Sequence, residues 1–192
     1  MKGLDKIWNK LIFCFKEVIC DSTSKVVGKI YIHGKKGGVT IGNNCTLISK
    51  STVNPTSGFS HCYFRTEKDG FIRIGNNVGI SHTNITSFTG VTIEDNVLIG
   101  SGTKIWDTDF HSVDITYRNC SENPYIKSLP ILIKEGAFIG ACSIILKGVT
   151  IGRNSVIGAG AVVTKNVPDN EIWAGNPAKF VKKLGGGDTL EP

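Results

Sequence analysis

The sequence has no long hydrophobic run, and this excludes a membrane-spanning helix because no apolar stretch approaches the roughly 18 residues that a bilayer requires. With only 6 prolines beside 23 glycines, the chain is neither proline-rich nor collagen-like. A run of five or more basic residues is also absent, so the net charge of +6 does not indicate a nucleic-acid-binding arm. A mild positive charge without such an arm is compatible with a small polyanionic ligand.

The six cysteines include no CxxC pair, and no clean secretory signal precedes them because Lys16 and Glu17 interrupt the apolar LIFCF segment. We therefore expect free thiols in a reducing cytoplasm. Of the 192 residues, 40% are apolar and 20% are charged, which is enough apolar material for a core and too little charge for disorder. This length allows one core domain.

The sequence does contain an apolar residue at every sixth position. A helix repeats about every 3.6 residues and a strand about every 2, so a period of six predicts short strands joined by tight turns. Such a repeat is a solenoid, and the small residues that follow, such as Gly140 and Gly152, indicate its corners. The clearest run consists of Ile133, Ile139, Ile145, Ile151, Ile157 and Val163.

One six-residue phrase recurs five times and is typical of a strand entering a turn, because Asn and Gly tolerate the positive φ that a tight turn requires. The isoleucines at its third position are 33, 19, 40 and 18 residues apart, and three hexapeptides account for 18. The excess residues predict inserted loops near 54–71 and 106–130. Since a repeat scaffold needs no long loop for its stability, the 106–130 loop is the first candidate for a functional site. The phrase reads VTIGNN at 39–44, IRIGNN at 72–77, VTIEDN at 91–96, ILIKEG at 131–136 and VTIGRN at 149–154.

Both ends of a solenoid need a cover. Apolar residues at helical spacing between Leu4 and Ile19 predict an N-terminal helix packed on the first coil, with a basic membrane-surface helix as the alternative. A short closing helix is expected around 180–184. The predicted divisions are a helical cap and lead-in at 1–38, the β-helix domain at 39–168, and a helical cap with a flexible tail at 169–192.

The hexapeptides, the phrase DTDFH at 107–111 and the closing run at 157–184 together resemble the hexapeptide-repeat acyltransferases. The resemblance covers 39–184 and is nearest to bacterial polysaccharide O-acetyltransferases and to maltose and galactoside acetyltransferases. It implies an all-β fold, a left-handed parallel β-helix, a homotrimer, and acetyl-CoA bound between neighbouring subunits. The left hand comes from the resemblance alone, because crossovers between parallel strands are right-handed in about 98% of cases.

Acetyl transfer from a thioester to a hydroxyl needs a base for the hydroxyl proton and donors for the oxyanion. Among the histidines, only His111 lies in the long loop directly after a coil strand, and the family's catalytic histidine ends this same segment. Residues two apart in an extended segment point the same way, so Asp107 or Asp109 is the expected partner that orients the imidazole. A surface histidine beside turn-forming aspartates is the alternative, and His82 is then the next candidate for the base.

By resemblance, six positions match the family's CoA-binding residues. Ala141 stands where sugar acetyltransferases carry Ser, and two of the lysines stand where Arg can occur, so a point charge replaces a bidentate fork. An ordinary solvated face would also explain the lysines. The expected CoA contacts are Ala141, Ala159, Thr164, Lys165, Lys179 and Lys182, and the expected substrate contacts are Ser81, Asn84, Trp106 and Arg118.

These assignments predict an acetyl-CoA-dependent O-acetyltransferase that acts on a sugar or polysaccharide precursor by direct attack, without metal or nucleic acid. A sugar amine, serine or an antibiotic hydroxyl are alternative acceptors, because the sequence does not choose among them. A zinc lyase of the γ-carbonic anhydrase type would need three histidines per site, and no H-x4-H pair is present. A non-catalytic interaction scaffold is the other alternative, since solenoids present long binding faces, but this function does not explain the DTDFH segment.

Overall fold

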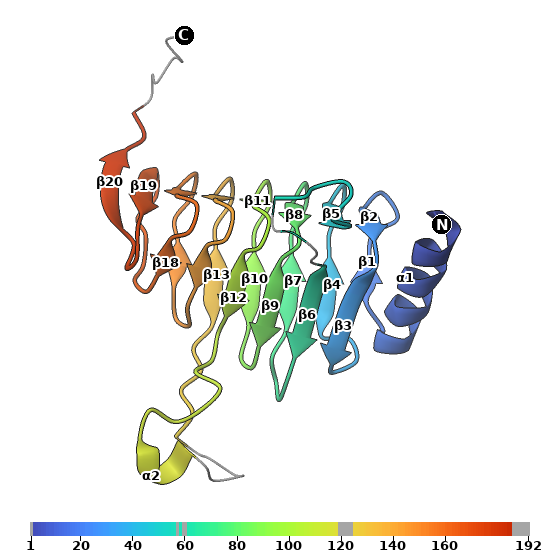
Figure 1. Ribbon diagram of the computed structural model, residues 1–192, viewed down its shortest axis with the longest axis horizontal. Helices are drawn as coiled ribbons and strands as arrows, with labels where there is room; N and C mark the ends of the chain where they lie inside the picture. The colour runs from blue at the N-terminus through green and yellow to red at the C-terminus, as the bar shows by residue number, and fades with distance from the viewer. Residues whose placement is uncertain (1, 57, 59–60, 119–124, 186–192) are drawn as a thin grey trace.

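The computed structural model describes residues 2–56, 58, 61–118 and 125–185 of the chain. It is a three-sided solenoid of short parallel strands, with one helix across its first end and an extruded loop on one flank (Figure 1). Because nearly all described elements are strands in three sheets, the predicted all-β class is confirmed. The helices are α1 (Lys2–Lys16), which covers the end, and α2 (Ile115–Arg118), which lies in the loop.

Each coil contributes one strand to each of three sheets, which we call sheets A, B and C. Sheet A contains β1 (Ile19–Cys20), β4 (Val39–Ile41), β7 (Ile72–Ile74), β10 (Val91–Ile93), β13 (Ile131–Ile133) and β16 (Thr150–Ile151). Sheet B contains β2 (Lys25–Gly28), β5 (Thr46–Ser49), β8 (Gly79–Ser81), β11 (Leu98–Ile99), β14 (Phe138–Ile139), β17 (Val156–Ile157), β19 (Glu171–Ala174) and β20 (Lys179–Lys183). Sheet C contains β3 (Ile30–Gly34), β6 (Cys62–Thr66), β9 (Asn84–Ser87), β12 (Lys104–Trp106), β15 (Ile144–Ile145) and β18 (Val162–Val163).

The core is a stack of the residues that recur every six positions. In sheet A the register places Ile74 beside Ile93 and Ile93 beside Ile133, and all three side chains are buried. The other two sheets stack Ile99 on Ile139 and Ile105 on Ile145 in the same way. Burying such columns is the dominant favourable term in folding, so the period predicted from the sequence is the period of the core.

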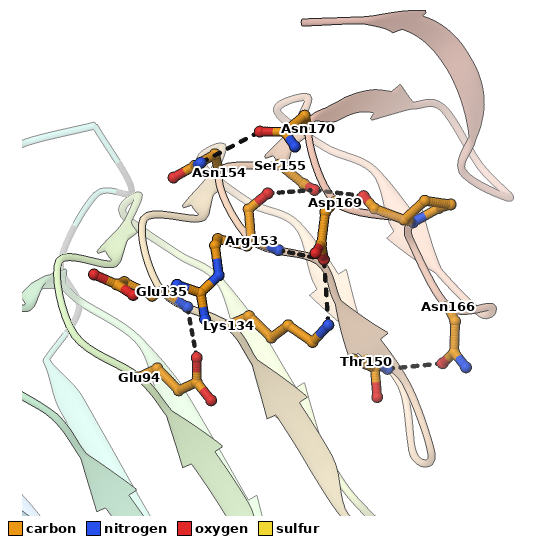
Figure 2. A network of polar contacts seen from close by, with 11 residues as sticks. Glu94, Lys134, Glu135, Thr150, Arg153, Asn154, Ser155, Asn166, Asp169 and Asn170 are labelled. Carbon is orange, nitrogen blue, oxygen red and sulfur yellow. Dashed lines mark hydrogen bonds and ion pairs between the residues drawn. The ribbon is translucent and has the colours of Figure 1, made fainter.

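The corner between sheets A and B is built as the recurring phrase predicts. Its last residue has a φ between 54° and 71° in all five copies. The carboxylate of Asp169 accepts the Arg153 N–H at 2.8 Å and the Lys134 ammonium at 3.2 Å, which ties successive coils together (Figure 2). The backbone hydrogen bond from Arg153 lowers the pKa of Asp169. Polar side chains at this corner therefore satisfy the backbone donors that the turns leave open.

Two predicted boundaries are wrong. The solenoid begins at Ile19 rather than at 39, because β1, β2 and β3 form a full coil that lacks the recurring phrase. The first insertion lies between β5 and β6, at 50–61 instead of 54–71, since Cys62–Thr66 pairs in register with β3 and β9. The spacing between the isoleucines gave the length of the insertion. It did not show after which strand of the coil the insertion begins.

The predicted C-terminal helix is also wrong. Residues Lys179–Lys183 form β20, which pairs antiparallel with β19 and covers the last edge of sheet B. An unpaired strand edge gains hydrogen bonds from such a partner, and this outweighs the helical pattern of a short segment. The predicted flexible tail, apart from Gly185, lies outside the described residues.

The N-terminal helix exists, but it packs with a different face from the predicted one. Its contacts with the first coil come from Asn9, which is buried, and from Ile12 and Phe13, which lie against the core. Leu4 and Leu11, which we expected in the contact, are largely exposed. Across the described ranges, no helix combines the length and the apolarity needed to cross a membrane.

Candidate active site

The extruded loop is held by a short antiparallel stem at the edge where sheet C turns into sheet A. We call this the C–A edge. Thr108 bridges Ser128, and their hydroxyls are 2.8 Å apart. The Leu129 N–H donates to the Asp107 carbonyl at 2.9 Å, and the Asp109 N–H donates to the Lys127 carbonyl at 3.0 Å. The stem fixes where the segment DTDFH leaves the solenoid.

Asp107 belongs to the scaffold and not to the predicted pair with His111. Its fully buried carboxylate accepts five hydrogen bonds, all from the corner at 87–90. The N–H groups of Phe88, Thr89 and Gly90 donate at 2.7–2.8 Å and form a nest for the negative charge. The two-residue spacing suggested alignment with His111, but the side chain turns inward at the end of β12.

Asp109 lies at the base of the loop and forms an ion pair with the next coil. Its Oδ1 is 2.5 Å from the Lys147 ammonium, and its backbone carbonyl accepts the His111 N–H at 2.7 Å. Within the described chain, its second carboxylate oxygen carries no hydrogen bond. Asp109 is therefore the predicted partner whose carboxylate still has an oxygen available to an imidazole.

His111 is presented outward by the strained residue before it. Phe110 has a φ of 59°, a conformation that a bulky residue adopts only when its surroundings impose it. Its ring packs edge-on against Trp106 and Phe88, with centroids 5.8 and 6.2 Å apart. Phe110 is thus anchored on the outer face of sheet C, and the next residue, His111, is exposed.

A hollow of about 570 Å³ lies on the extruded loop, lined by residues on both sides of His111 in the sequence but not by His111 itself. Tyr117 and Tyr125 face each other across 4.2 Å between ring centroids. Hydrogen bonds from Thr116 lower the pKa of Asp114, so its carboxylate stays ionised here. Aromatic faces beside hydroxyls, carboxylates and one ammonium suit a polar ring compound. The lining residues are Asp109, Ser112, Val113, Asp114, Tyr117, Tyr125 and Lys127.

The two predicted substrate contacts of this region serve mainly to shape it. Trp106 is half-buried beneath Phe110. Arg118 donates from Nη2 to the Val113 carbonyl at 2.8 Å and from Nε to the Ser112 carbonyl at 3.3 Å. Its guanidinium therefore pins the loop's own backbone around the hollow.

Other predicted residues gather at a different edge, where sheet B turns into sheet C. We call this the B–C edge. Ser81 ends β8 and Asn84 begins β9, while Ala141 and Ala159 follow β14 and β17 on successive coils. The amides of Ala141 and Ala159 donate to no acceptor in the described part of the chain. Small side chains and open amides at one edge can receive an extended ligand that carries amide groups.

His82, the next candidate for the base after His111, lies at the same edge. It is buried, has a φ of 43°, and its Nδ1 lies 3.0 Å from the Ser101 hydroxyl. Burial, followed by the nearby His61, lowers the pKa of His82, so the imidazole is neutral near pH 7. Among the described residues, the buried atoms that lack a hydrogen-bond partner are His82 Nε2 and Asn84 Oδ1. Two such atoms two residues apart indicate a polar site that needs a further molecule.

The predicted phosphate-binding residues divide between these edges. Lys179 begins β20 directly after the turn at 175–178, and Lys182 lies further along the same strand. Thr164 and Lys165 follow β18 and lie at the C–A edge with Lys147. Within one chain, the width of sheet C therefore separates Ala141 and Ala159 from the loop of His111, whereas Thr164 and Lys165 lie at the same edge as that loop.

Two family models match the chain in its repeats. The model described as bacterial transferase hexapeptide (six repeats) matches residues 130–165, and that of the hexapeptide repeat of succinyl-transferase matches 90–105. The galactoside O-acetyltransferase of Escherichia coli is 39% identical over 115 residues, which are 59% of this chain and 54% of that protein. The Lactococcus lactis galactoside O-acetyltransferase is 37% identical over 102 residues, 52% of this chain and 46% of that protein. The chain thus spans about half the length of the curated relatives it matches.

Solved structures share the whole architecture. A mutant of AntD, an N-acyltransferase from Bacillus cereus in complex with dTDP-4-amino-4,6-dideoxyglucose and coenzyme A, superposes with a TM-score of 0.71. It is 22% identical and covers 92% of this chain and 88% of its own. The acetyl-CoA complex of a hexapeptide-repeat acetyltransferase from Vibrio cholerae gives 0.62 at 23% identity, over 92% of this chain and 75% of that one. The shared fold is the left-handed parallel β-helix expected from the sequence.

Proposed function

Because this chain belongs to the hexapeptide-repeat acyltransferase family, we propose that it is an acetyl-CoA-dependent O-acetyltransferase acting on a sugar or polysaccharide precursor. The observation that carries the proposal is the position of His111. It directly follows the anchored Phe110 on the extruded loop, whose hollow is lined with aromatic and polar groups. The galactoside O-acetyltransferases among the relatives support a sugar hydroxyl as the acceptor.

In the proposed reaction, the His111 imidazole removes the proton from the acceptor hydroxyl as its oxygen attacks the thioester carbonyl. The tetrahedral intermediate collapses, the C–S bond breaks, and the imidazolium returns the proton to the departing CoA sulfur. Asp109 orients the imidazole through its free carboxylate oxygen. Asn84 supplies a polar contact to the thioester or the acceptor, which would use the amide oxygen that is buried without a partner.

We further propose that the active assembly is a homotrimer. His111 lies at the C–A edge and Ala141 and Ala159 at the B–C edge, so a complete site needs one edge from each of two copies. Acetyl-CoA would lie along the B–C edge of one subunit and face the His111 loop of its neighbour. Because the thiols of Cys14, Cys20, Cys45, Cys62 and Cys142 are free, we place the reaction in the reducing cytoplasm.

A subunit-mixing experiment tests the shared site. His111→Ala and Ala159→Trp should each be inactive, the first for lack of the base and the second because an indole fills the exposed CoA edge. Mixed during refolding, they should recover about a quarter of wild-type activity, since that share of junctions combines an intact loop with an intact edge. Remixing His111→Ala with itself is the control. Recovery no greater than this control, or a fully active monomer by light scattering, would contradict the shared site.

A panel of acceptors tests the chemistry. Release of CoA thiol from acetyl-CoA should require a saccharide hydroxyl and fall about 10²–10⁴-fold in His111→Ala. A sugar amine is the second candidate, because the AntD neighbour was solved with an amino-sugar nucleotide. Turnover of amino sugars but not of their hydroxyl analogues would replace the proposed acceptor. No thiol release with any acceptor would favour the scaffold interpretation.

A further inference from the structure

The helix at the first end of the solenoid exposes a continuous apolar stripe. Leu4, Ile7, Leu11 and Phe15 are spaced by three or four residues and therefore share one face of α1. Between 58% and 67% of each residue's surface is exposed, and Ile19, directly after the helix, is 64% exposed. Figure 1 places this helix across the end of the coils, with nothing beyond it. The stripe is thus an open surface of the described chain.

The stripe cannot turn inward, because the opposite face of the helix is fixed by polar contacts. The buried Asn9 side chain donates to the Gly28 carbonyl at 2.9 Å and accepts the Ile30 N–H at 3.1 Å. At the border of the stripe, the indole of Trp8 donates to the Ile30 carbonyl at 2.9 Å. Rotating the helix would leave these buried groups unpaired, which is costly. The exposure of the stripe is therefore built into the fold.

Lysines border the stripe at Phe15 and at the neighbouring Trp8. The ammonium groups of Lys16 and Lys36 lie 5.3 and 5.9 Å from the centre of the Phe15 ring, and that of Lys29 lies 5.5 Å from Trp8. Residues 1–36 contain 8 basic and 3 acidic residues, a net charge of +5. The remaining residues contain 14 basic and 13 acidic residues, a net charge of +1. Nearly all of the protein's net charge of +6 is therefore concentrated at the end that carries the stripe.

We propose that this N-terminal face, formed by the stripe and the surrounding lysines, docks on an anionic lipid surface. An amphipathic helix with a basic rim lies in the membrane interface, where its apolar side chains enter the acyl boundary and its lysines meet the headgroups. A hollow of about 160 Å³ between Trp8, Leu11, Ile12 and Phe15 can take apolar chain segments. Two copies meeting through this face would bring two charges of the same sign together, which disfavours a second copy as the occupant. The inference does not depend on the proposed reaction.

Vesicle co-sedimentation of the full chain tests this docking. The protein should pellet with vesicles that contain 30% phosphatidylglycerol and stay in solution with pure phosphatidylcholine. Leu11→Gln with Phe15→Gln, and separately Lys29→Gln with Lys36→Gln, should each weaken binding to the anionic vesicles by about tenfold or more. High salt should weaken the binding of the wild type.

Matched controls come from the opposite end of the solenoid. Val181→Gln replaces an apolar residue that is 57% exposed on β20, and Lys183→Gln removes an exposed charge there. Both should bind vesicles as the wild type does, and unchanged melting temperatures would show that all variants fold. Equal losses in the controls, or no binding of the wild type to anionic vesicles, would overturn the proposal. Dissociation of an oligomer by Leu11→Gln with Phe15→Gln, without vesicle binding by the wild type, would instead assign the stripe to a second copy.

Discussion

The Asp109 carboxylate and the Lys147 ammonium are 2.5 Å apart and join the extruded loop to the following coil. Each side chain is only about a quarter exposed, at 25% and 26%, so solvent screens the pair less than it screens a surface pair. The same Asp109 accepts the His111 N–H through its carbonyl. Lys147 is therefore connected, through one residue, to the backbone of the proposed base.

Replacing Lys147 with Met should affect activity more than stability. Exposed ion pairs contribute about 0.2–1 kcal/mol, and this pair, which is still a quarter exposed, should contribute about 1 kcal/mol, so urea unfolding should shift little. The loop base loses its tie to the solenoid, and misplacing His111 should lower kcat by about tenfold or more. Lys183→Met, at an exposed position on β20, is the control. A kcat equal to that of the wild type would show that the pair does not position the loop.

Asp107→Ala should produce the opposite pattern. It removes the acceptor of five hydrogen bonds and leaves buried donors of the 87–90 corner unpaired, so the free energy of unfolding should fall by about 2–5 kcal/mol. Urea unfolding measures this loss. Asp109→Asn should lower activity with little loss of stability, and equal stability losses in the two variants would refute the division of roles.

His82 should make stability depend on pH. Burial lowers its pKa in the folded chain, whereas the unfolded chain titrates at about 6.5. Between these values the unfolded state binds the proton and the folded state does not, so stability rises with pH and is lost as the pH falls below about 6.5. His82→Asn tolerates the positive φ and removes the titration. Melting temperatures between pH 5 and 7.5 should fall less steeply in this variant than in His33→Asn, and parallel slopes would exclude His82 as the cause.

The three lysines assigned to CoA should act additively and weakly. Each exposed phosphate contact contributes about 0.2–1 kcal/mol, so Lys165→Ala, Lys179→Ala and Lys182→Ala together should raise the KM for acetyl-CoA by about tenfold. The effect should shrink at high salt, and kcat should stay near the wild-type value. Steady-state kinetics at two ionic strengths measure both effects. An unchanged KM would remove these lysines from the site.

The repeats were predictable because a column such as Ile74, Ile93 and Ile133 needs the same residue type at each level. The turn chemistry was predictable for a similar reason, since a corner at positive φ selects Asn or Gly, as at Asn77 and Asn154. The first coil was not predicted because it contains no copy of the recurring six-residue phrase. β20 escaped because pairing with β19 decides the conformation of a short segment.

The candidate site was predictable only in part. The position of His111 in a long loop followed from the spacing of the isoleucines. The role of Asp107 did not, because a sequence cannot show that a side chain turns inward to a distant corner. His82 ranked only second among the histidines because its importance arises from burial beside Ser101, which lies on the next coil. The available signal was a bulky residue at a positive-φ position where the three following coils carry the smaller Gly102, Cys142 and Gly160.

The width of sheet C, which separates His111 from Ala141 and Ala159, also has a genetic consequence. In the proposed ring of three chains, each chain lends its loop to one neighbour and its CoA edge to the other. A chain that lacks His111 therefore inactivates only the site that its loop forms with one neighbour. Its own CoA edge still forms an active site with the intact loop of the third chain. Alleles damaged in the loop and alleles damaged at the edge should complement each other when expressed in one cell, whereas two alleles of the same kind should not.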